Sequence, residues 1–384
     1  MSRLPLEGIT VVSFEQAVAA PFATRQLADL GARVIKIERD SGDFARGYDT
    51  KVRGMASYFV WLNRSKESVV LDLKSPEGMR AARELVARAD VFVQNLAPGA
   101  VERMGLGAAD ALALNPRLIH VSISGYGESG PYRDKKAYDL LVQCEAGLVS
   151  ITGTPDQPSK VGISIADIAA GMYAYTGVLT ALIQRGITGE GQRVEVSMLE
   201  ALAEWMGHPY FYAEYGGQPP ARTGSAHATI APYGPYRCAD GAVFLAVQNE
   251  REWERFCRDV VRDAALVDDE RFRGNAARVE HRDELDAVLA PVLNTLTREE
   301  MTSRLDTAAI ANAELRDIAG LSQHPQLEAR DRWHDVDSPV GMLRTLVPPV
   351  TANWRVRMDP VPALGADTER VLAELALPPR ESSA

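Results

Sequence analysis

Short apolar runs alternate with amphipathic segments over the first 125 residues of the chain. Each run predicts a buried strand, because nearly continuous apolar residues are typical of strands covered on both faces. The segments between them carry helix signals: Ser75 and Pro76 stand where an N-cap and a first helical residue belong, and Gly31 follows a helical pattern. The alternation predicts a parallel sheet with helices on its faces. The runs are residues 9–14, 33–38, 68–73, 91–95 and 118–125.

The pattern changes in the second half of the chain. Residues 168–185 predict a helix buried on most sides, and residues 191–198 predict one more strand. A stretch rich in Gly and Pro then predicts a linker, and the turn at 239–241 predicts a hairpin. The length of 384 residues suggests about two domains. We therefore predict a large α/β domain in 1–205, a linker in 206–225, a smaller α+β domain in 226–316, a second linker in 317–335, and a tail in 336–384 that returns to the large domain.

Composition and charge narrow the class of function. The chain has 42 basic and 52 acidic residues, a formal net charge of -10, and no basic runs, which argues against nucleic acid as the main partner. We see no signal-peptide pattern and no uninterrupted apolar stretch of roughly 20 residues, so we expect no membrane partner. The cysteines show no metal-like spacing and predict reduced thiols in a cytoplasmic protein without a metal site. They are Cys144, Cys238 and Cys257.

Polar and basic residues follow the predicted strands, at the edge where open α/β sheets bind ligands. Arg39, Lys66, Asn95 and Arg103 are placed there by the pattern, and a ligand with several phosphates would suit them. The alternative interpretation is that these residues are ordinary solvated charges on the surface. The loop at 15–21 lacks the glycines of a nicotinamide-binding fingerprint, which disfavours a dinucleotide oxidoreductase.

One carboxylate, Asp167, is the only charged side chain at neutral pH in the apolar stretch 161–184. By position it predicts an N-cap of the following helix, and the alternative is a catalytic group. Asp139 also has a purely structural interpretation, since an acid in the first turn of a helix is favoured by the helix dipole. Among the six histidines, His227 lies in a loop rich in small residues, with no Ser or Cys nucleophile placed against it.

An ordered series of motifs resembles the family III CoA-transferases, the CaiB/BaiF group. It begins with "GITVVSFEQAVAAPFATRQLADLGARVIKIER", continues through "NRSKESVVLDLKSPEG", "VQNLAPGAVERMGLG" and "ADIAAGMYAYTG", and ends with "PALGADTERVL". The resemblance implies a Rossmann-like large domain, a small domain and an interlocked homodimer. It implies that Asp167 is catalytic and that Tyr138 and Asp139 lie near the thioester. By the same resemblance, CoA would contact Ala17, Val18, Arg39, Leu71, Asn95, Leu96, Arg103, Met104 and Lys136.

The chemistry that the resemblance implies uses CoA thioesters as substrates and no tightly bound cofactor. The Asp167 carboxylate would form an acyl anhydride and then an aspartyl-CoA thioester before CoA passes to an acceptor acid. We expect the helix N-terminus to favour the ionised carboxylate and nearby backbone N–H groups to stabilise the developing oxyanions. We also expect the small residues Ala166, Ala169, Ala170 and Gly171 to leave clearance for the thioester and its pantetheine arm.

Two departures from the family pattern bear on the reaction. Tyr138 stands where the racemase branch has a histidine, which favours CoA transfer over racemisation, although an acyl-CoA racemase stays the alternative. Formyl-CoA transferases carry a run of glycines where this chain has "RTGSAHATIAPYGPY", so oxalate and formyl-CoA are disfavoured. The resemblance is closest to the dicarboxylate branch, with succinyl-CoA as donor and itaconate, mesaconate or citramalate as acceptor. Arg46, Arg222 and His227 are candidates to bind the second carboxylate. A CoA-binding protein without turnover is a third hypothesis.

Overall fold

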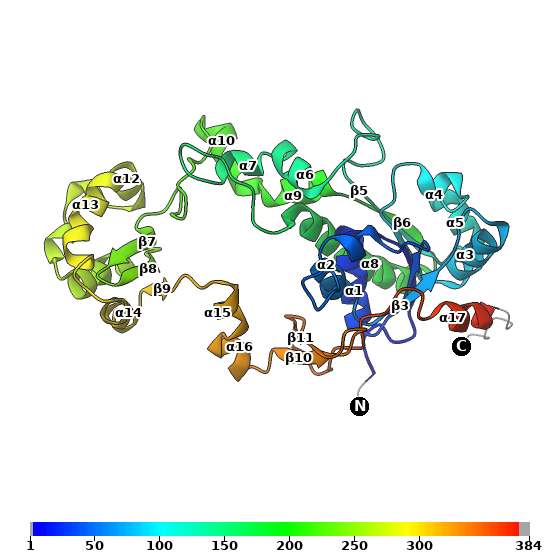
Figure 1. Ribbon diagram of the computed structural model, residues 1–384. Coiled ribbons are helices and arrows are strands. Elements are labelled where there is room, and N and C mark those ends of the chain that lie inside the picture. Colours follow the sequence, from blue (N-terminus) through cyan, green and yellow to red (C-terminus); the bar gives the residue numbers. More distant parts are fainter. Residues whose placement is uncertain (1–2, 376–384) are drawn as a thin grey trace. The chain divides into compact units, whose positions relative to one another are not determined.

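The computed structural model describes residues 3–375, and the chain divides into two compact units. Unit 1 comprises residues 1–146, 162–206 and 326–384, and unit 2 comprises residues 147–161 and 207–325. Figure 1 labels the elements of both units along the chain. Residues 147–161 belong with unit 2 because the Arg222 guanidinium donates hydrogen bonds to three carbonyl oxygens of that segment, those of Ser150, Thr154 and Pro155.

Unit 1 is built on a six-stranded sheet in which every strand pair is parallel, in the order β3-β2-β1-β4-β5-β6. The chain winds outward in one direction from β1 and then in the other from β4, which is the doubly wound α/β arrangement. This confirms the α/β fold with a Rossmann-like parallel sheet. The strands are β1 (Thr10–Phe14), β2 (Arg33–Glu38), β3 (Lys66–Val70), β4 (Val91–Gln94), β5 (Ile119–Ser124) and β6 (Gln192–Ser197).

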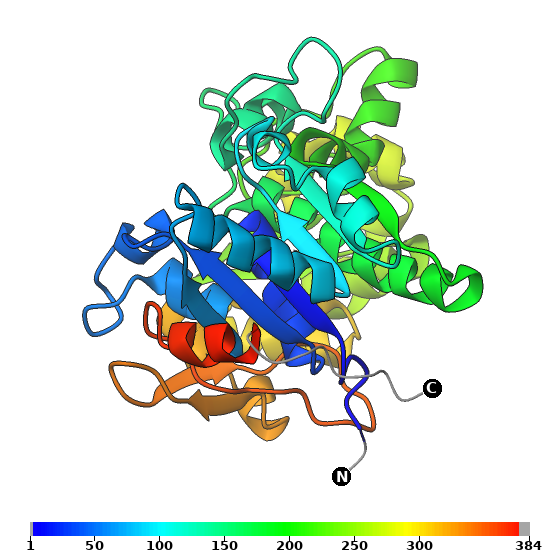
Figure 2. The same cartoon turned by 90° about the vertical axis from the view of Figure 1, so that its right-hand side faces the viewer.

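Helices cover both faces of this sheet. On one face, Val12 and Phe14 of β1 belong to an apolar core with Leu85 and Val86 of α3 and Val371 of α17; Figure 2 views the sheet from this side, with α17 in red. On the other face, α1 and α8 pack closely against each other. The helices of unit 1 include α1 (Ala19–Asp29), α2 (Ser57–Asn63), α3 (Pro76–Arg88), α4 (Ala100–Arg103), α5 (Ala108–Leu114), α6 (Asp139–Glu145), α8 (Ile165–Thr188), α9 (Met198–Trp205) and α17 (Thr368–Leu375).

Helix α8 is the one helix within residues 3–375 that is long and apolar enough to span a bilayer by length and composition. It contacts α1, α9 and β6, and its small residues Ala166, Ala169 and Ala170 are fully buried. Arg185, in its last turn, is buried and ion-pairs with Asp90 at 3.0 Å. These contacts are typical of a core helix in an α/β protein.

The predicted strand at 68–73 differs most from the structure, since β3 runs from Lys66 to Val70. The strand ends early because the chain turns at Asp72, whose carbonyl accepts the Ser75 N–H at 3.0 Å. It begins early because the charged Lys66 is itself buried and paired. The apolar pattern could not indicate that a lysine belongs to a buried strand.

Unit 2 holds a three-stranded antiparallel sheet, in the order β7-β8-β9, over a separate apolar core. The predicted hairpin is confirmed, because Cys238 pairs with Gly241 across the turn. Trp253, Phe256 and Phe272 are fully buried in this core. The main elements are β7 (Tyr233–Cys238), β8 (Gly241–Ala246), β9 (Ala311–Ala313), α10 (Gly207–Gly216), α11 (Glu250–Arg255), α12 (Asn275–Glu280), α13 (Arg282–Leu293) and α14 (Arg298–Thr307).

The C-terminal segment of unit 1 covers the outer edge of β3. After β10 (Trp333–Val336) and β11 (Leu343–Leu346), the chain runs beside β3, and Ser68 N–H donates to the Asp367 carboxylate at 3.0 Å. Val70 N–H donates to Thr368 Oγ1 at 3.0 Å, and Gly365 N–H donates to Ser68 Oγ at 2.9 Å. Edge strands need such partners because their unpaired N–H groups otherwise invite pairing with another chain.

We expect Asp367→Ala to destabilise unit 1, because it removes the acceptor of the partly buried Ser68 N–H. The loss should be about 1–2 kcal/mol, the usual cost of leaving such a donor unpaired. Chemical denaturation monitored by circular dichroism measures it, with Glu369→Ala as control because Glu369 is exposed on the neighbouring helical turn. Equal effects of the two substitutions would contradict this role of Asp367.

Candidate active site

Asp167 lies in the first turn of α8, half-buried, at its third residue. The helix begins at Ile165, three residues earlier than the sequence pattern indicated, and Ser164 is its N-cap residue. The N-cap prediction for Asp167 is therefore wrong. Ser164 makes no side-chain cap hydrogen bond; its hydroxyl instead contacts the Tyr58 hydroxyl at 3.1 Å.

The first turn of α8 is capped by a residue from another helix. Asp139, the first residue of α6, accepts the Ala166 N–H at 2.8 Å and the Asp167 N–H at 3.3 Å through one carboxylate oxygen. Its other oxygen accepts a hydrogen bond from the Gln143 side-chain amide at 2.6 Å. Backbone N–H groups near Asp167 were expected to stabilise oxyanions. The N–H groups of Ala166 and Asp167 are not free for this role, because the Asp139 carboxylate already occupies them.

Burial and the neighbouring Asp139 carboxylate together set the charge of Asp167. Burial, the larger cause, and the negative charge of Asp139 raise the pKa of Asp167 to about 7. The expectation that the helix N-terminus favours the ionised form fails, since the positive end of the helix is already neutralised by a carboxylate. A carboxyl group that changes protonation near neutral pH is suited to act as a nucleophile or a base under ordinary conditions.

The small residues of this helix serve packing rather than clearance. Ala166, Ala169 and Ala170 are fully buried. A side-chain carbon on Gly171 would lie 2.6 Å from the Ala19 carbonyl oxygen of α1, so glycine is required for the close approach of the two helices. The prediction that these four residues leave room for a thioester is therefore wrong.

Tyrosine side chains lie near the start of α8: Tyr48 interacts electrostatically with Asp167, and the Tyr58 hydroxyl contacts Ser164. Tyr138 precedes α6 and is 66% exposed, and Tyr48 and Tyr58 form an edge-to-face pair with ring centroids 5.7 Å apart. Burial raises the pKa of Tyr48 to about 12, and the charges of Asp43 and Asp167 contribute. Tyr48 therefore stays protonated at neutral pH. Neither Tyr48 nor Tyr58 was predicted from the sequence; the aromatic residues in "GDFARGY" and "ASYFVWLN" were the available signal.

Most residues predicted to contact CoA lie near the carboxyl edge of the sheet in unit 1. Arg39 follows β2 and donates to the Gly42 carbonyl at 3.1 Å, and Asn95 follows β4. Arg103 ends α4, with its guanidinium close to Gly99, where an added side-chain carbon would lie 2.8 Å from it. The other predicted contacts are three apolar residues and one cation. Leu71 is buried in the apolar core between the sheet and α3, and Leu96 and Met104 pack against that core. Lys136 is exposed in the loop before α6.

The loop after β1 carries Ala17 and Val18. Ala17 has a backbone φ of 61°, which is unusual for a residue other than glycine. Val18 is buried and is the N-cap residue of α1. The side chain of Asn95 binds this loop twice: its oxygen accepts the Gln16 N–H at 2.8 Å, and its amide donates to the Gln16 carbonyl at 2.9 Å.

Two basic residues are placed differently from expectation. Lys66 is not an exposed ligand group at the sheet edge, because its ammonium is fully buried and donates to Glu15 at 2.6 Å, to the Pro21 carbonyl and to Asn63. Arg46 is not free to bind a second carboxylate, since its guanidinium forms a two-point pair with Glu38 and lies 3.6 Å from the centroid of the Phe59 ring.

The remaining candidates for the second carboxylate lie in unit 2. Arg222 is engaged by the three carbonyl groups of residues 150–155 described above. His227 accepts the Thr229 N–H at 3.2 Å through Nδ1, and its ring stacks on Tyr233 with centroids 5.0 Å apart. Burial lowers the pKa of His227, which favours the neutral imidazole.

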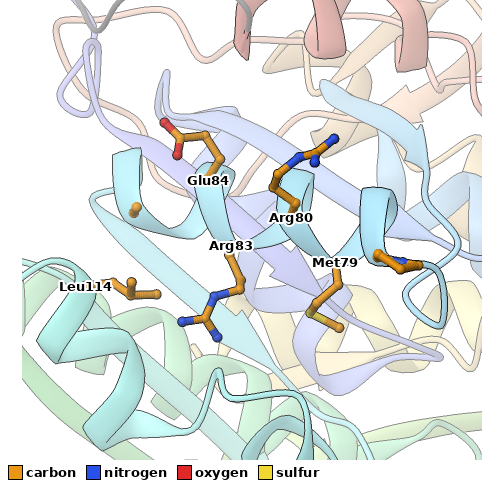
Figure 3. Close-up of a pocket in the computed structure, with 7 residues that line it drawn as sticks. Met79, Arg80, Arg83, Glu84 and Leu114 are labelled. Atoms are coloured by element: carbon orange, nitrogen blue, oxygen red, sulfur yellow. The ribbon is translucent and has the colours of Figure 1, made fainter.

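A surface hollow lies on α3 and at the end of α5 (Figure 3). It contains none of the candidate site residues. Arg83, at its wall, donates to the Gly105 carbonyl at 2.8 Å. No cluster of three His, Cys, Asp or Glu side chains that could hold a metal ion occurs within residues 3–375. The lining residues are Pro76, Met79, Arg80, Arg83, Glu84, Ala87 and Leu114.

Comparisons with known proteins agree on one family. The model of CoA-transferase family III matches residues 6–368. The chain is 35% identical to the succinate–glutarate CoA-transferase of Agrobacterium fabrum, over 97% of this chain and 96% of that protein. It is 32% identical to the succinyl-CoA–D-citramalate CoA-transferase of Chloroflexus aurantiacus, over 97% of this chain and 94% of that protein. The crystal structure of a CaiB/BaiF family protein from Brucella suis superposes with a TM-score of 0.85 at 32% identity, covering 97% of this chain and all of that one.

We expect Asp167→Asn to stabilise the protein at alkaline pH. The pKa of Asp167 is higher in the fold than its ordinary value of 3.8, so the stability that the protonated group contributes is present below about pH 4 and is lost as pH rises through about 7. The amide of the Asp167→Asn variant does not ionise, so the variant does not lose this stability as pH rises. The melting temperature of Asp167→Asn minus that of the wild type should therefore increase from pH 5 to pH 8, by about a few degrees.

Differential scanning calorimetry across this pH range measures the effect. Asp110→Asn is the matched control, because Asp110 is exposed on α5 and loses the same charge. A difference for Asp167→Asn that does not vary with pH would contradict the raised pKa.

Proposed function

The chain belongs to CoA-transferase family III, and on that premise we propose that it transfers CoA from succinyl-CoA to a free dicarboxylic acid through a covalent intermediate on Asp167. The observation that carries the proposal is the environment of Asp167: half-buried, beside Asp139, with its pKa raised to about 7. A desolvated carboxylate of this basicity is a better nucleophile than an ordinary surface carboxylate.

The reaction proceeds by exchange at three carbonyl groups, those of the donor, of Asp167 and of the acceptor. The Asp167 carboxylate attacks the thioester carbonyl of the donor; the C–S bond breaks, CoA leaves as the thiolate, and an acyl-aspartyl anhydride remains. The thiolate then attacks the aspartyl carbonyl, which releases the donor acid and leaves an aspartyl-CoA thioester. The acceptor carboxylate attacks this thioester; its C–S bond breaks, the CoA thiolate leaves, and an aspartyl–acceptor anhydride forms. The thiolate then attacks the acceptor's carbonyl in this anhydride, which gives the new acyl-CoA and releases the Asp167 carboxylate.

Oxyanion stabilisation needs donors other than the first N–H groups of α8, because Asp139 occupies them. Tyr48 is a suitable donor, since its raised pKa keeps its hydroxyl protonated and its electrostatic coupling to Asp167 places it nearby. Tyr138, which precedes Asp139, is the second candidate.

Binding of CoA is proposed at the carboxyl edge of the sheet, with the nucleotide phosphates on Arg39, Arg103 and Lys136. Guanidinium groups suit phosphate because they donate parallel hydrogen bonds. Binding the distant nucleotide holds the thiolate near Asp167 between the two halves of the reaction, which makes its return attack effectively intramolecular.

The acceptor is proposed to be a C4–C5 dicarboxylate such as itaconate, mesaconate or citramalate. The names of the relatives support this class, since they are transferases of glutarate and citramalate. Of the three residues first considered for the second carboxylate, Arg46 and Arg222 are held by protein partners, so His227 is the candidate that we retain.

An interlocked homodimer in the cytoplasm is proposed from the family resemblance. Exposed rings on α10 are in keeping with an interface on this helix: Phe211 is 61% and Tyr215 is 78% exposed. Light scattering of the purified protein tests the dimer.

A second candidate activity is racemisation or isomerisation of an acyl-CoA. A carboxyl group with a pKa near 7 also suits a general base, so the environment of Asp167 favours this reaction as well. Deuterium exchange at the α-carbon of a 2-methylacyl-CoA in D₂O, without an acceptor acid, distinguishes the two. Transfer predicts no exchange.

We expect incubation with succinyl-CoA followed by hydroxylamine to convert Asp167 to a hydroxamate, visible in a peptide mass spectrum. Asp167→Ala should lose transfer by at least about a thousandfold, as for other covalent nucleophiles. Asp110→Asn is the control. Full transfer by Asp167→Ala, or a label on another residue, would overturn the mechanism. A matrix of CoA donors against free acids, with oxalate and monocarboxylates included, identifies the acid pair.

We expect kcat/KM for succinyl-CoA to rise with pH through about 7, because Asp167 must be ionised to attack. Asp139→Asn removes the neighbouring negative charge while its amide oxygen can still accept the α8 N–H groups. The acid limb should then move to lower pH, by on the order of one unit. Asp134→Asn, in the exposed loop before α6, should leave the limb in place. An unmoved limb in Asp139→Asn would show that Asp139 does not act through Asp167.

A further inference from the structure

A buried charge network lies under the loop that follows β1. Lys36, in β2, is fully buried, and its ammonium lies 3.3 Å from Glu15 and 2.8 Å from Asp43. Glu15, at the start of the loop, also accepts hydrogen bonds from Lys66 at 2.6 Å and from the Thr24 hydroxyl at 2.5 Å. Burying charges costs free energy unless each charge is paired. A buried network in which every charge has a partner holds its side chains rigidly.

The network reaches the backbone of the loop through Asp43. One oxygen of Asp43 accepts the Lys36 ammonium, and the other accepts the Ala17 N–H at 3.1 Å and the Ala45 N–H at 2.9 Å. From the other side, Asn95 holds the preceding residue, Gln16, by its N–H and its carbonyl. Two adjacent peptide groups are thus fixed by side chains from the loops after β2 and β4.

The segment held in this way is strained. Ala17 has a φ of 61°, a left-handed conformation that costs a non-glycine residue free energy and persists only where its surroundings enforce it. Strained backbone of this kind is concentrated at ligand-binding sites, where the ligand needs one fixed conformation.

We propose that Asp43, anchored by Lys36, is a positioning residue that holds Ala17 in its left-handed conformation and so pre-forms the loop that receives CoA. Asn95 acts as the second half of the same clamp. This inference rests on the proposed CoA site at the carboxyl edge of the sheet. It assigns to Asp43 and Lys36 no contact with substrate.

The test uses the full-length enzyme and succinyl-CoA. Asp43→Asn puts an amide N–H against the Lys36 ammonium or against the loop N–H groups, so the clamp is broken. We expect the KM for succinyl-CoA and the Kd for free CoA to rise on the order of tenfold, with kcat and the KM of the acceptor acid nearly unchanged. Asp40→Asn is the matched control, since Asp40 is exposed in the same loop and binds only its neighbour, the Ser41 N–H.

A rescue separates positioning from general damage. Glycine adopts positive φ without strain, so Ala17→Gly added to Asp43→Asn should recover at least half of the lost CoA affinity. A merely structural role for Asp43 predicts no recovery. If Asp43→Asn does not fold, Asn95→Ala tests the other half of the clamp, because Asn95 is only half-buried, and the same selective rise is expected.

The proposal is overturned if Asp43→Asn and Asn95→Ala bind CoA as the wild type and Asp40→Asn do, or if kcat falls while CoA affinity is kept. Failure of the proposed function looks different. In that case, wild-type enzyme gives no Asp167 hydroxamate or does not bind free CoA at all.

Discussion

The carboxylate of Asp139 accepts the first N–H groups of α8, and the candidate active site depends on that contact. A helix N-terminus ordinarily favours a nearby anion because its N–H groups are unpaired. Here one carboxylate takes those groups, and a second, Asp167, lies within the same turn without them. The Asp139 carboxylate that caps α8 thereby destabilises the ionised form of Asp167. The raised pKa of Asp167 thus has two causes: its burial, which is the larger, and the charge of Asp139, which the meeting of α6 and α8 places beside it.

Local pattern predicted the scaffold well. Near-continuous apolar runs predicted five of the six strands of the sheet to within a few residues, and the pattern at 191–198 predicted the sixth, β6. The Ser75–Pro76 signal predicted the start of α3. These features depend on residues that are neighbours in sequence. The cap of α8 does not, since Asp139 precedes Ala166 by 27 positions, and no rule of local spacing assigns it. Asp167 was therefore predicted as the catalytic residue, which stays a prediction, while its protonation and its place in the helix were expected incorrectly.

The basic residues show the same limit more strongly. Lys66 and Arg46 are residue types that often bind anionic ligands. The sequence does not indicate that Lys66 pairs with Glu15 or that Arg46 pairs with Glu38. Glu15 and Lys66 are 51 positions apart and meet only once the parallel sheet has formed. Glu38 and Arg46 are 8 positions apart, and their pairing depends on the turn that follows β2. Asn95 lies at the predicted edge, yet its side chain holds the loop after β1. Residue type and strand position predict where a site lies. Which side chains are free to bind a ligand depends on the ion pairs and hydrogen bonds that form in the folded chain.

The covered edge of β3 has a consequence for how the protein is made. The strand is complete once residue 70 has emerged from the ribosome, whereas the groups that accept the outer N–H groups of Ser68 and Val70 belong to Asp367 and Thr368. While the intervening residues are being synthesised, this edge lacks these partners, and open strand edges are where nascent chains associate wrongly. Completion of the edge is thus delayed until residues lying 298 and 299 positions later in the chain have been made, and a chain released before residue 367 leaves a permanently open edge.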